Sequence, residues 1–277
     1  MEKNNASRRR RPFGRVRLFC GLAACLASAA TSFAEGVNLS RAEAMRIGRK
    51  IWQNECGGTV AGLTSWNAGE NFASLGIGHF IWYPRGVRGP FDESFPELAN
   101  FAAGRNVKLP RVVAENRETG CPWRSRGEFL ADSDSADVRE LRSFLADTVD
   151  LQTEFLVRRL QQALPKMMER APAADRANVR RQFERVASTP QGCYALVDYV
   201  NFKGEGLLET ERYGGRGWGL LQVLQGMTGS EAGGGGAQEF SRSARAVLTQ
   251  RVENSPPERK EFRWLAGWLQ RVNSYTH

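Results

Sequence analysis

The chain has 277 residues, which suits one large domain or two lobes that share a groove. Hydrophobic residues make up 41% of it, so a sizeable core is expected and a disordered chain is not. The net charge of +9 indicates an anionic partner, such as nucleic acid, a membrane surface or an acidic cell-wall polymer, but part of this charge lies in the first 17 residues, which we do not expect in the mature protein. With only 2 histidines, the composition argues against a His-rich zinc site.

The first 34 residues are typical of a secretory signal peptide. Residues 1–17 form a basic head, residues 18–34 form an apolar run too short for a stable transmembrane helix, and small residues precede Glu35. We place cleavage after Ala34 and expect a periplasmic or secreted protein. Residues 22–25 also resemble a lipobox, and on that alternative Cys25 would be a lipidated membrane anchor.

Three cysteines remain in the mature chain: Cys56, Cys121 and Cys193. For an exported protein we expect one disulfide and one buried free thiol, and the sequence does not select the pair. No cysteine or histidine spacing resembles a metal site, and no cofactor is implied.

The first mature helix is predicted from its ends. Ser40 and Glu43 have the spacing of a capping box, apolar residues recur with the helical period up to Ile51, and Gly57 and Gly58 end the helix. Strands are predicted at 59–66 and 74–83 around a turn at 67–69, and these form a small antiparallel sheet.

The rest of the chain is predicted to be mostly helical. Residues 84–128 are expected to be loops with short helices, and 233–236 a flexible loop. Helices are predicted at 135–168 with a kink or end at Pro165, at 173–186, at 191–202, from Phe240, and from a proline-containing first turn at 255–258. The predicted class is α+β: a single domain over 35–277, with a small β lobe at about 57–130 and a helical lobe at about 131–277.

Glu55 is the first candidate catalytic residue. At 100° per residue it lies only about 20° around the helix from Ala44, on the apolar stripe and at the C-terminal end. Burial and the negative end of the helix dipole both raise the pKa of a carboxyl group placed there, as a general acid requires. The alternative is a capping or salt-bridged glutamate that merely ends the helix.

Residues 74–79, Ser-Leu-Gly-Ile-Gly-His, form the second candidate element. In a continuous strand, Ser74, Gly76 and Gly78 would share a face without bulky side chains, which a ligand could approach closely. The structural alternative is a bulged strand with a hydrogen-bonded His79.

A helix that ends in Glu, followed by a hairpin with this motif, resembles the phage-type lysozymes and endolysins. The resemblance implies a mainly helical lysozyme-like fold, Glu55 as the acid that protonates the glycosidic oxygen, Ser74 as the residue that holds the attacking water, and His79 as its support. Residues 196–206 resemble the family's helix that ends in a Gly-Glu pair, and 252–259 resemble its Asn-x-Thr-Pro-x-Arg segment. Residues 217–222 are similar to the Gly-Leu-Leu-Gln element of goose-type lysozymes and lytic transglycosylases.

The family's hairpin aspartate has no counterpart at the expected spacing. Asn67, Glu70 and Asn71 are the candidates, and Glu70 is the only carboxylate among them. Three options follow: Glu70 is the base, the enzyme works with one carboxylate as a lytic transglycosylase does, or the site is inactive. An inverting glycosidase needs its two carboxyl groups about 6.5–9.5 Å apart.

The remaining candidates are weaker. Glu205 could line the groove, and Gln222 could contact the N-acetyl groups of the substrate. The aromatic residues of the hairpin could stack on sugars, although core positions are the more ordinary interpretation, as they are for Trp264 and Trp268.

The sequence therefore predicts an exported monomeric glycosidase that cleaves the β-1,4 glycan strands of peptidoglycan. A non-catalytic glycan-binding protein on the same fold is the main alternative. A secreted nuclease is a weaker one, because the chain shows no evident metal-binding cluster, and we expect no nucleic-acid partner.

Overall fold

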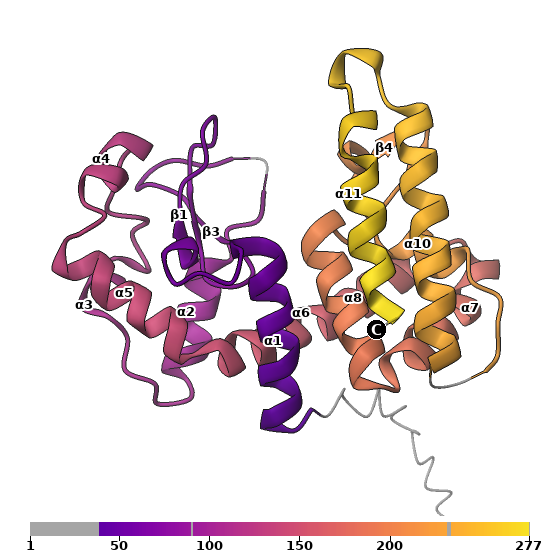
Figure 1. Ribbon diagram of the computed structural model, residues 1–277, viewed down its shortest axis with the longest axis horizontal. Helices are drawn as coiled ribbons and strands as arrows, with labels where there is room; N and C mark the ends of the chain where they lie inside the picture. Colours follow the sequence, from indigo (N-terminus) through magenta and orange to yellow (C-terminus); the bar gives the residue numbers. More distant parts are fainter. Residues whose placement is uncertain (1–38, 90, 232–233, 277) are drawn as a thin grey trace, which may run out of the picture. The chain divides into compact units, whose positions relative to one another are not determined.

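The computed structural model describes residues 39–276, apart from residues 90, 232 and 233 (Figure 1). The chain divides into two units, Met1–Glu35 and Gly36–His277, and every described residue belongs to the second. The predicted signal peptide and Cys25 lie outside the described residues. No described helix is both long enough and apolar enough to span a bilayer.

The described chain is mainly helical with a small antiparallel sheet, which confirms the α+β class. The helices are α1 (Arg41–Cys56), α2 (Phe95–Ala103), α3 (Arg111–Asn116), α4 (Arg126–Ala131), α5 (Ala136–Asp147), α6 (Val149–Arg170), α7 (Ala173–Ala187), α8 (Pro190–Lys203), α9 (Leu220–Gln225), α10 (Gly234–Asn254) and α11 (Phe262–Asn273). The strands are β1 (Thr64–Ser65), β2 (Ala73–Leu75), β3 (Phe80–Trp82), β4 (Arg212–Tyr213) and β5 (Arg216–Gly217).

Helix α1 has the predicted ends. The Ser40 side chain accepts from the Glu43 backbone N–H, the Glu43 carboxylate accepts from the Ser40 N–H, and Gly57 ends the helix with φ 62°. Ala44, Ile47 and Ile51 are buried, so the predicted apolar stripe faces the core. Glu55 on that stripe is thereby directed inward at the end of the helix.

The sheet has the order β1-β2-β3, and both pairings are antiparallel. The predicted turn at 67–69 connects β1 to β2, with Ser65 paired to Ser74, so Glu70 lies in this connection. The prediction of one continuous strand over 74–83 is wrong. Residues 76–79 turn the chain from β2 into β3, and Gly76 and His79 both have positive φ, 71° and 49°.

This turn is held by a buried glutamine of α6. The Oε1 atom of Gln152 accepts from the Ile77 N–H at 2.9 Å, and its Nε2 donates to the Leu145 carbonyl at 2.7 Å. A Cβ atom at Gly76 would approach Gln152 Oε1 to 2.4 Å. The glycine thus serves the close packing of the turn against α6, and the predicted open face for a ligand is absent here.

Three helix boundaries also differ from the predictions. The expected helix over 135–168 is two helices, because Thr148 leaves helical geometry and its hydroxyl bonds to the Phe144 carbonyl at 2.7 Å. Pro165 lies inside α6 and does not end it, since buried residues on both sides keep the helix packed. Helix α10 already begins at Gly234, within the expected flexible loop.

The start of the last helix lies later than predicted. The prolines at 256 and 257 lead into a single 3-10 turn, Pro257–Arg259, which ends at Lys260 with φ 50°. Helix α11 then begins at Phe262 and runs beside α10 (Figure 1). Val272 is buried, and Leu265 and Trp268 are half-buried against the core, but Phe262 and Trp264 are exposed, so the expected core position of Trp264 is wrong.

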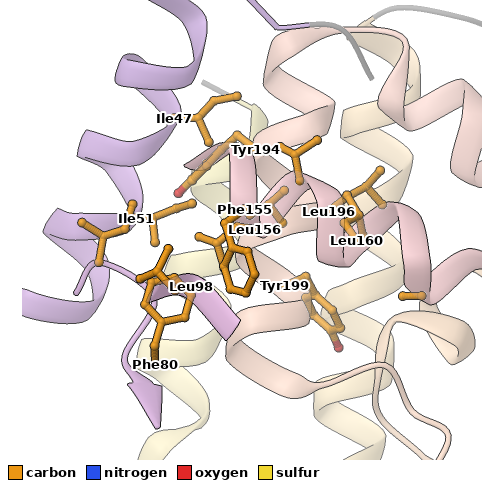
Figure 2. Close-up of a cluster of buried hydrophobic side chains, with 14 of the residues drawn as sticks. Ile47, Ile51, Phe80, Leu98, Phe155, Leu156, Leu160, Tyr194, Leu196 and Tyr199 are labelled. Atoms are coloured by element: carbon orange, nitrogen blue, oxygen red, sulfur yellow. The ribbon is translucent and has the colours of Figure 1, made fainter. Parts of the chain in front are cut away.

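One hydrophobic core joins the sheet to the helices. Figure 2 shows Ile51 of α1, Phe80 of β3, Leu156 of α6 and Tyr194 of α8 within one cluster. The hairpin aromatic residues Trp66, Phe80, Trp82 and Tyr83 are all buried, so they belong to the core and are not available for sugar stacking.

The expected disulfide is absent. Cys56, Cys121 and Cys193 are buried free thiols in separate parts of the core. Burial raises the pKa of each thiol to about 12, so all three are unreactive thiols at neutral pH.

We predict that Gln152→Leu destabilises the protein by about 2–4 kcal/mol, because the Ile77 N–H and the Leu145 carbonyl would lose their buried partner. Urea unfolding followed by circular dichroism measures the effect. The matched control is Gln162→Leu at an exposed position of the same helix, which should change stability by less than about 0.5 kcal/mol. Equal effects of the two substitutions would contradict the role of Gln152.

Candidate functional site

Glu55 lies at the centre of a cluster of charged and polar side chains, which we name the Glu55 cluster: Glu55, His79, Asp198, Asn201 and Arg271. The Glu55 side chain is 14% exposed, so it is largely buried but still reaches the surface. Its Oε1 accepts from Arg271 Nη2 and from Asn201 Nδ2, the latter at 3.2 Å. Its Oε2 is 3.6 Å from His79 Nδ1. Hydrogen-bond donors from α11 and α8 and the His79 ring from the β2–β3 turn therefore meet at the end of α1.

Asp198 is the second acidic residue of the Glu55 cluster. It is 0% exposed, and its carboxylate accepts from Arg271 Nε at 2.8 Å and Nη2 at 2.9 Å. It also accepts from the Tyr275 hydroxyl at 2.6 Å and from Asn54 Nδ2 at 3.1 Å. A buried carboxylate with this many donors satisfies its lone pairs, as burial of a charge requires.

The Arg271 guanidinium bridges the two carboxylates. Burial lowers the pKa of Arg271, but the charges and hydrogen bonds of Asp198, together with the charge of Glu55, outweigh it and raise the pKa above its ordinary value. The guanidinium is therefore a fixed positive charge. Sequence reasoning missed it, since nothing in the local pattern of α11 distinguishes Arg271 from the other basic residues of the chain.

This geometry matches the alternative interpretation, in which Glu55 is a salt-bridged residue at the end of its helix. The Arg271 guanidinium occupies the Glu55 oxygen that a general acid would present to a substrate.

The hairpin candidates form a separate group. Glu70 Oε2 accepts from Asn67 Nδ2 at 3.1 Å and from Ser74 Oγ at 3.4 Å. Ser74 is only 3% exposed and its hydroxyl is directed at Glu70, which leaves it little access to a water molecule. Among the contacts of the described residues, none joins Asn67, Glu70 or Ser74 to Glu55.

Glu205 lies just beyond the C-terminal end of α8, and Gln222 of α9 lies beside the same loop. The Leu221 N–H donates to the Glu205 carbonyl at 3.0 Å, and the Gln222 amide bonds to Gly219 N–H at 3.0 Å and to the Gly206 carbonyl at 3.1 Å. Both ends of the Gln222 amide are thus used by the main chain, and they hold this loop rather than a sugar. Burial raises the pKa of the Glu205 carboxyl, with Lys166 and Arg159 opposing it.

Lys203 is a further unusual residue that the sequence pattern did not reveal. It is 9% exposed, and its Nζ lies 3.4 Å from the ring centre of Trp268 and 3.9 Å from that of Phe202. Burial, together with the nearby Arg251, lowers the pKa of Lys203 to about 6. Phe202 also faces the Arg271 guanidinium at 4.2 Å, so Lys203 adjoins the Glu55 cluster.

No metal centre accompanies these groups among the residues that the structure describes, since no three His, Cys, Asp or Glu side chains there are placed to share an ion. Comparisons of the chain with protein-family models, with curated proteins and with solved structures found no match.

We predict that Lys203→Met stabilises the protein at pH 7 by on the order of 1–3 kcal/mol, because folding of the natural chain at this pH must strip the proton from a buried amine and the variant avoids that cost. Between about pH 6 and pH 10.5 the unfolded chain holds the Lys203 proton and the folded chain does not. The stability of the natural protein therefore rises with pH across that window, and the advantage of the variant shrinks towards pH 10.

Urea unfolding at pH 7, 8.5 and 10 measures this change. Lys108→Met, at an exposed lysine, is the control and should show no such trend. A Lys203→Met variant that is destabilised by the same amount at all three pH values would show that the rings hold a charged ammonium.

Proposed function

We propose that this protein is a lysozyme-type glycosidase that cleaves the β-1,4 glycan strands of peptidoglycan, with Glu55 and Glu205 as its two functional carboxyl groups. The observation that carries the proposal is the Glu55 carboxylate itself, which is 14% exposed and held by groups from three separate elements. Such a carboxylate is rigidly positioned and can still meet a ligand.

The two carboxyl groups have environments that suit different roles. Glu55 is positioned by hydrogen bonds from Arg271 and Asn201, and this fixed carboxyl group suits the stabilisation of an oxocarbenium-like transition state or the activation of water. Burial raises the pKa of Glu205, and a carboxyl group that keeps its proton suits the general acid. The general-acid role, which the position on the helix predicted for Glu55, is thus assigned to Glu205, a residue just beyond the end of α8.

Residues 1–34 carry a net charge of +6, so the proposed mature chain keeps only +3, a weakly basic balance that is consistent with an acidic polymer as the substrate. Export through a signal peptide in residues 1–34, to the periplasm or the medium, is part of the same proposal, as is a lysozyme-like fold. A single working carboxyl group would instead favour lytic transglycosylase chemistry, in which an anhydro ring and no free reducing end is formed.

A non-catalytic glycan-binding protein is the second candidate function. The ion pair favours it, because Arg271 occupies the Glu55 oxygen that a catalytic carboxyl would present to substrate. The position of Glu70 favours it also, since that carboxylate is bonded to Asn67 and Ser74 and makes no described contact with Glu55.

We predict that wild-type protein clears purified cell wall in a zymogram, and that Glu55→Gln and Glu205→Gln each reduce the rate by about 100-fold or more. Glu115→Gln, at a side chain 58% exposed, is the matched control and should retain full activity. Circular dichroism confirms that each variant is folded.

The pH profile separates the two roles. A general acid must be protonated, so activity should fall as the pH rises through the pKa of Glu205, and Glu205→Asp should move that alkaline limb while Glu55→Asp should not. Reducing-end analysis of the products distinguishes hydrolysis from transglycosylation. If the wild type and all variants bind cell wall and none of them clears it, the protein is a glycan-binding protein and not a glycosidase.

A further inference from the structure

A pocket of about 460 Å³ lies between the β4–β5 hairpin, α9 and α10. The residues that line it and matter here are Arg212, Arg216, Gln222, Gln225, Ser243 and Gln250, and we name it the arginine pocket. It shares no residue with the Glu55 cluster. Gly215, Gly217 and Gly226 also line it, and the absence of side chains at these positions leaves its volume open.

The charged lining of the arginine pocket is wholly basic. Arg212 and Arg216 are its only charged members, and no acidic residue lines it in the part of the chain that the structure describes. Gly217 is the strand partner of Arg212, so no side chain stands across from Arg212 on that face of the hairpin.

The Arg212 guanidinium lacks a full set of partners. Its Nε is buried without a hydrogen-bond partner, and the Glu209 carboxylate 3.8 Å away is 91% exposed and beyond hydrogen-bond distance. Its Nη1 reaches only the Gly215 carbonyl, at 3.4 Å. Buried N–H groups are almost always paired in folded proteins, so the Arg212 guanidinium has donor capacity left for a further acceptor.

The other polar groups show which kind of ligand would fit. Gln222 is bonded to the main chain, Gln225 Nε2 donates to Asp175 at 2.8 Å, and Ser243 Oγ donates to the Val223 carbonyl at 2.7 Å. The Gln250 amide and the Arg216 guanidinium make no hydrogen bond to a described residue. The donors with capacity left are thus the Arg216 guanidinium, the Gln250 amide and the Arg212 guanidinium, whose one hydrogen bond is the long contact to Gly215. Ala246 and Val247 give one wall an apolar character.

We propose that the arginine pocket binds a small oxyanion ligand, a carboxylate or a phosphate on a partly apolar body, through Arg212 with support from Arg216 and Gln250. The planar guanidinium fork matches both oxyanions and forms short, charge-assisted hydrogen bonds with them. The site is separate from the proposed glycosidase site, and binding there does not depend on peptidoglycan cleavage.

Isothermal titration calorimetry at low ionic strength tests the proposal with glutarate and inorganic phosphate as the two probes. We expect saturable one-site binding of at least one probe by wild type, with an affinity about tenfold or more lower in Arg212→Gln, because the charge-assisted pair is lost. Arg216→Gln should weaken binding less, and since Arg216 is exposed this variant retains the fold. Saturation by only one probe identifies the class of oxyanion, and the neutral analogue glutaramide should not bind.

Arg245→Gln is the matched control. Arg245 lies on α10 outside the pocket, where it bonds to Asn273 at 2.7 Å. Equal losses of affinity in Arg245→Gln and Arg212→Gln would show non-specific attraction to a basic protein and overturn the proposal. Absence of saturable binding by both probes would also overturn it, as would unchanged affinity in both pocket variants.

Discussion

The pairing of Arg271 with Asp198 and Glu55 is the constraint on which the arrangement of the helices around the site depends. One guanidinium near the C-terminal end of α11 contacts a fully buried carboxylate of α8 and the last inward-facing carboxylate of α1. Removing one member of such a buried set leaves an uncompensated charge in the interior. The stability lost in this way is far larger than the stability that the ion pair provides relative to apolar residues of similar size. The ends of three helices are therefore held in one geometry.

This constraint also sets the chemistry that the site can perform. Arg271 positions the Glu55 carboxylate and offsets its negative charge. Two neighbouring residues have shifted pKa values. Lys203 is desolvated between two aromatic rings, and Glu205 is a carboxyl group whose pKa burial raises. Lys203, with a lowered pKa, and Glu205, with a raised pKa, thus lie at the C-terminal end of α8 and in the loop that follows it.

Helix α10 links this region to the arginine pocket. Gln250 lines the pocket, and the adjacent Arg251 forms a bidentate pair with the buried Glu261, at 2.8 Å for both contacts. Arg251 also faces the ring of Trp268 at 4.9 Å, the same ring that covers Lys203. A chain of packed charges and rings therefore runs from the pocket to the candidate site.

Local sequence patterns were sufficient for features whose hydrogen bonds close within a few residues. The capping box and terminal glycine determined α1, the turn at 67–69 determined the first hairpin, and helical spacing placed Glu55 on the inward face. The tertiary structure alone decided the partner of Glu55, because Arg271 is 216 residues away along the chain. It also decided that Gly76 packs against Gln152 and that the cysteines stay unpaired. These outcomes depend on which helices pack together, and a pattern that repeats every two or four residues carries no information about a distant partner.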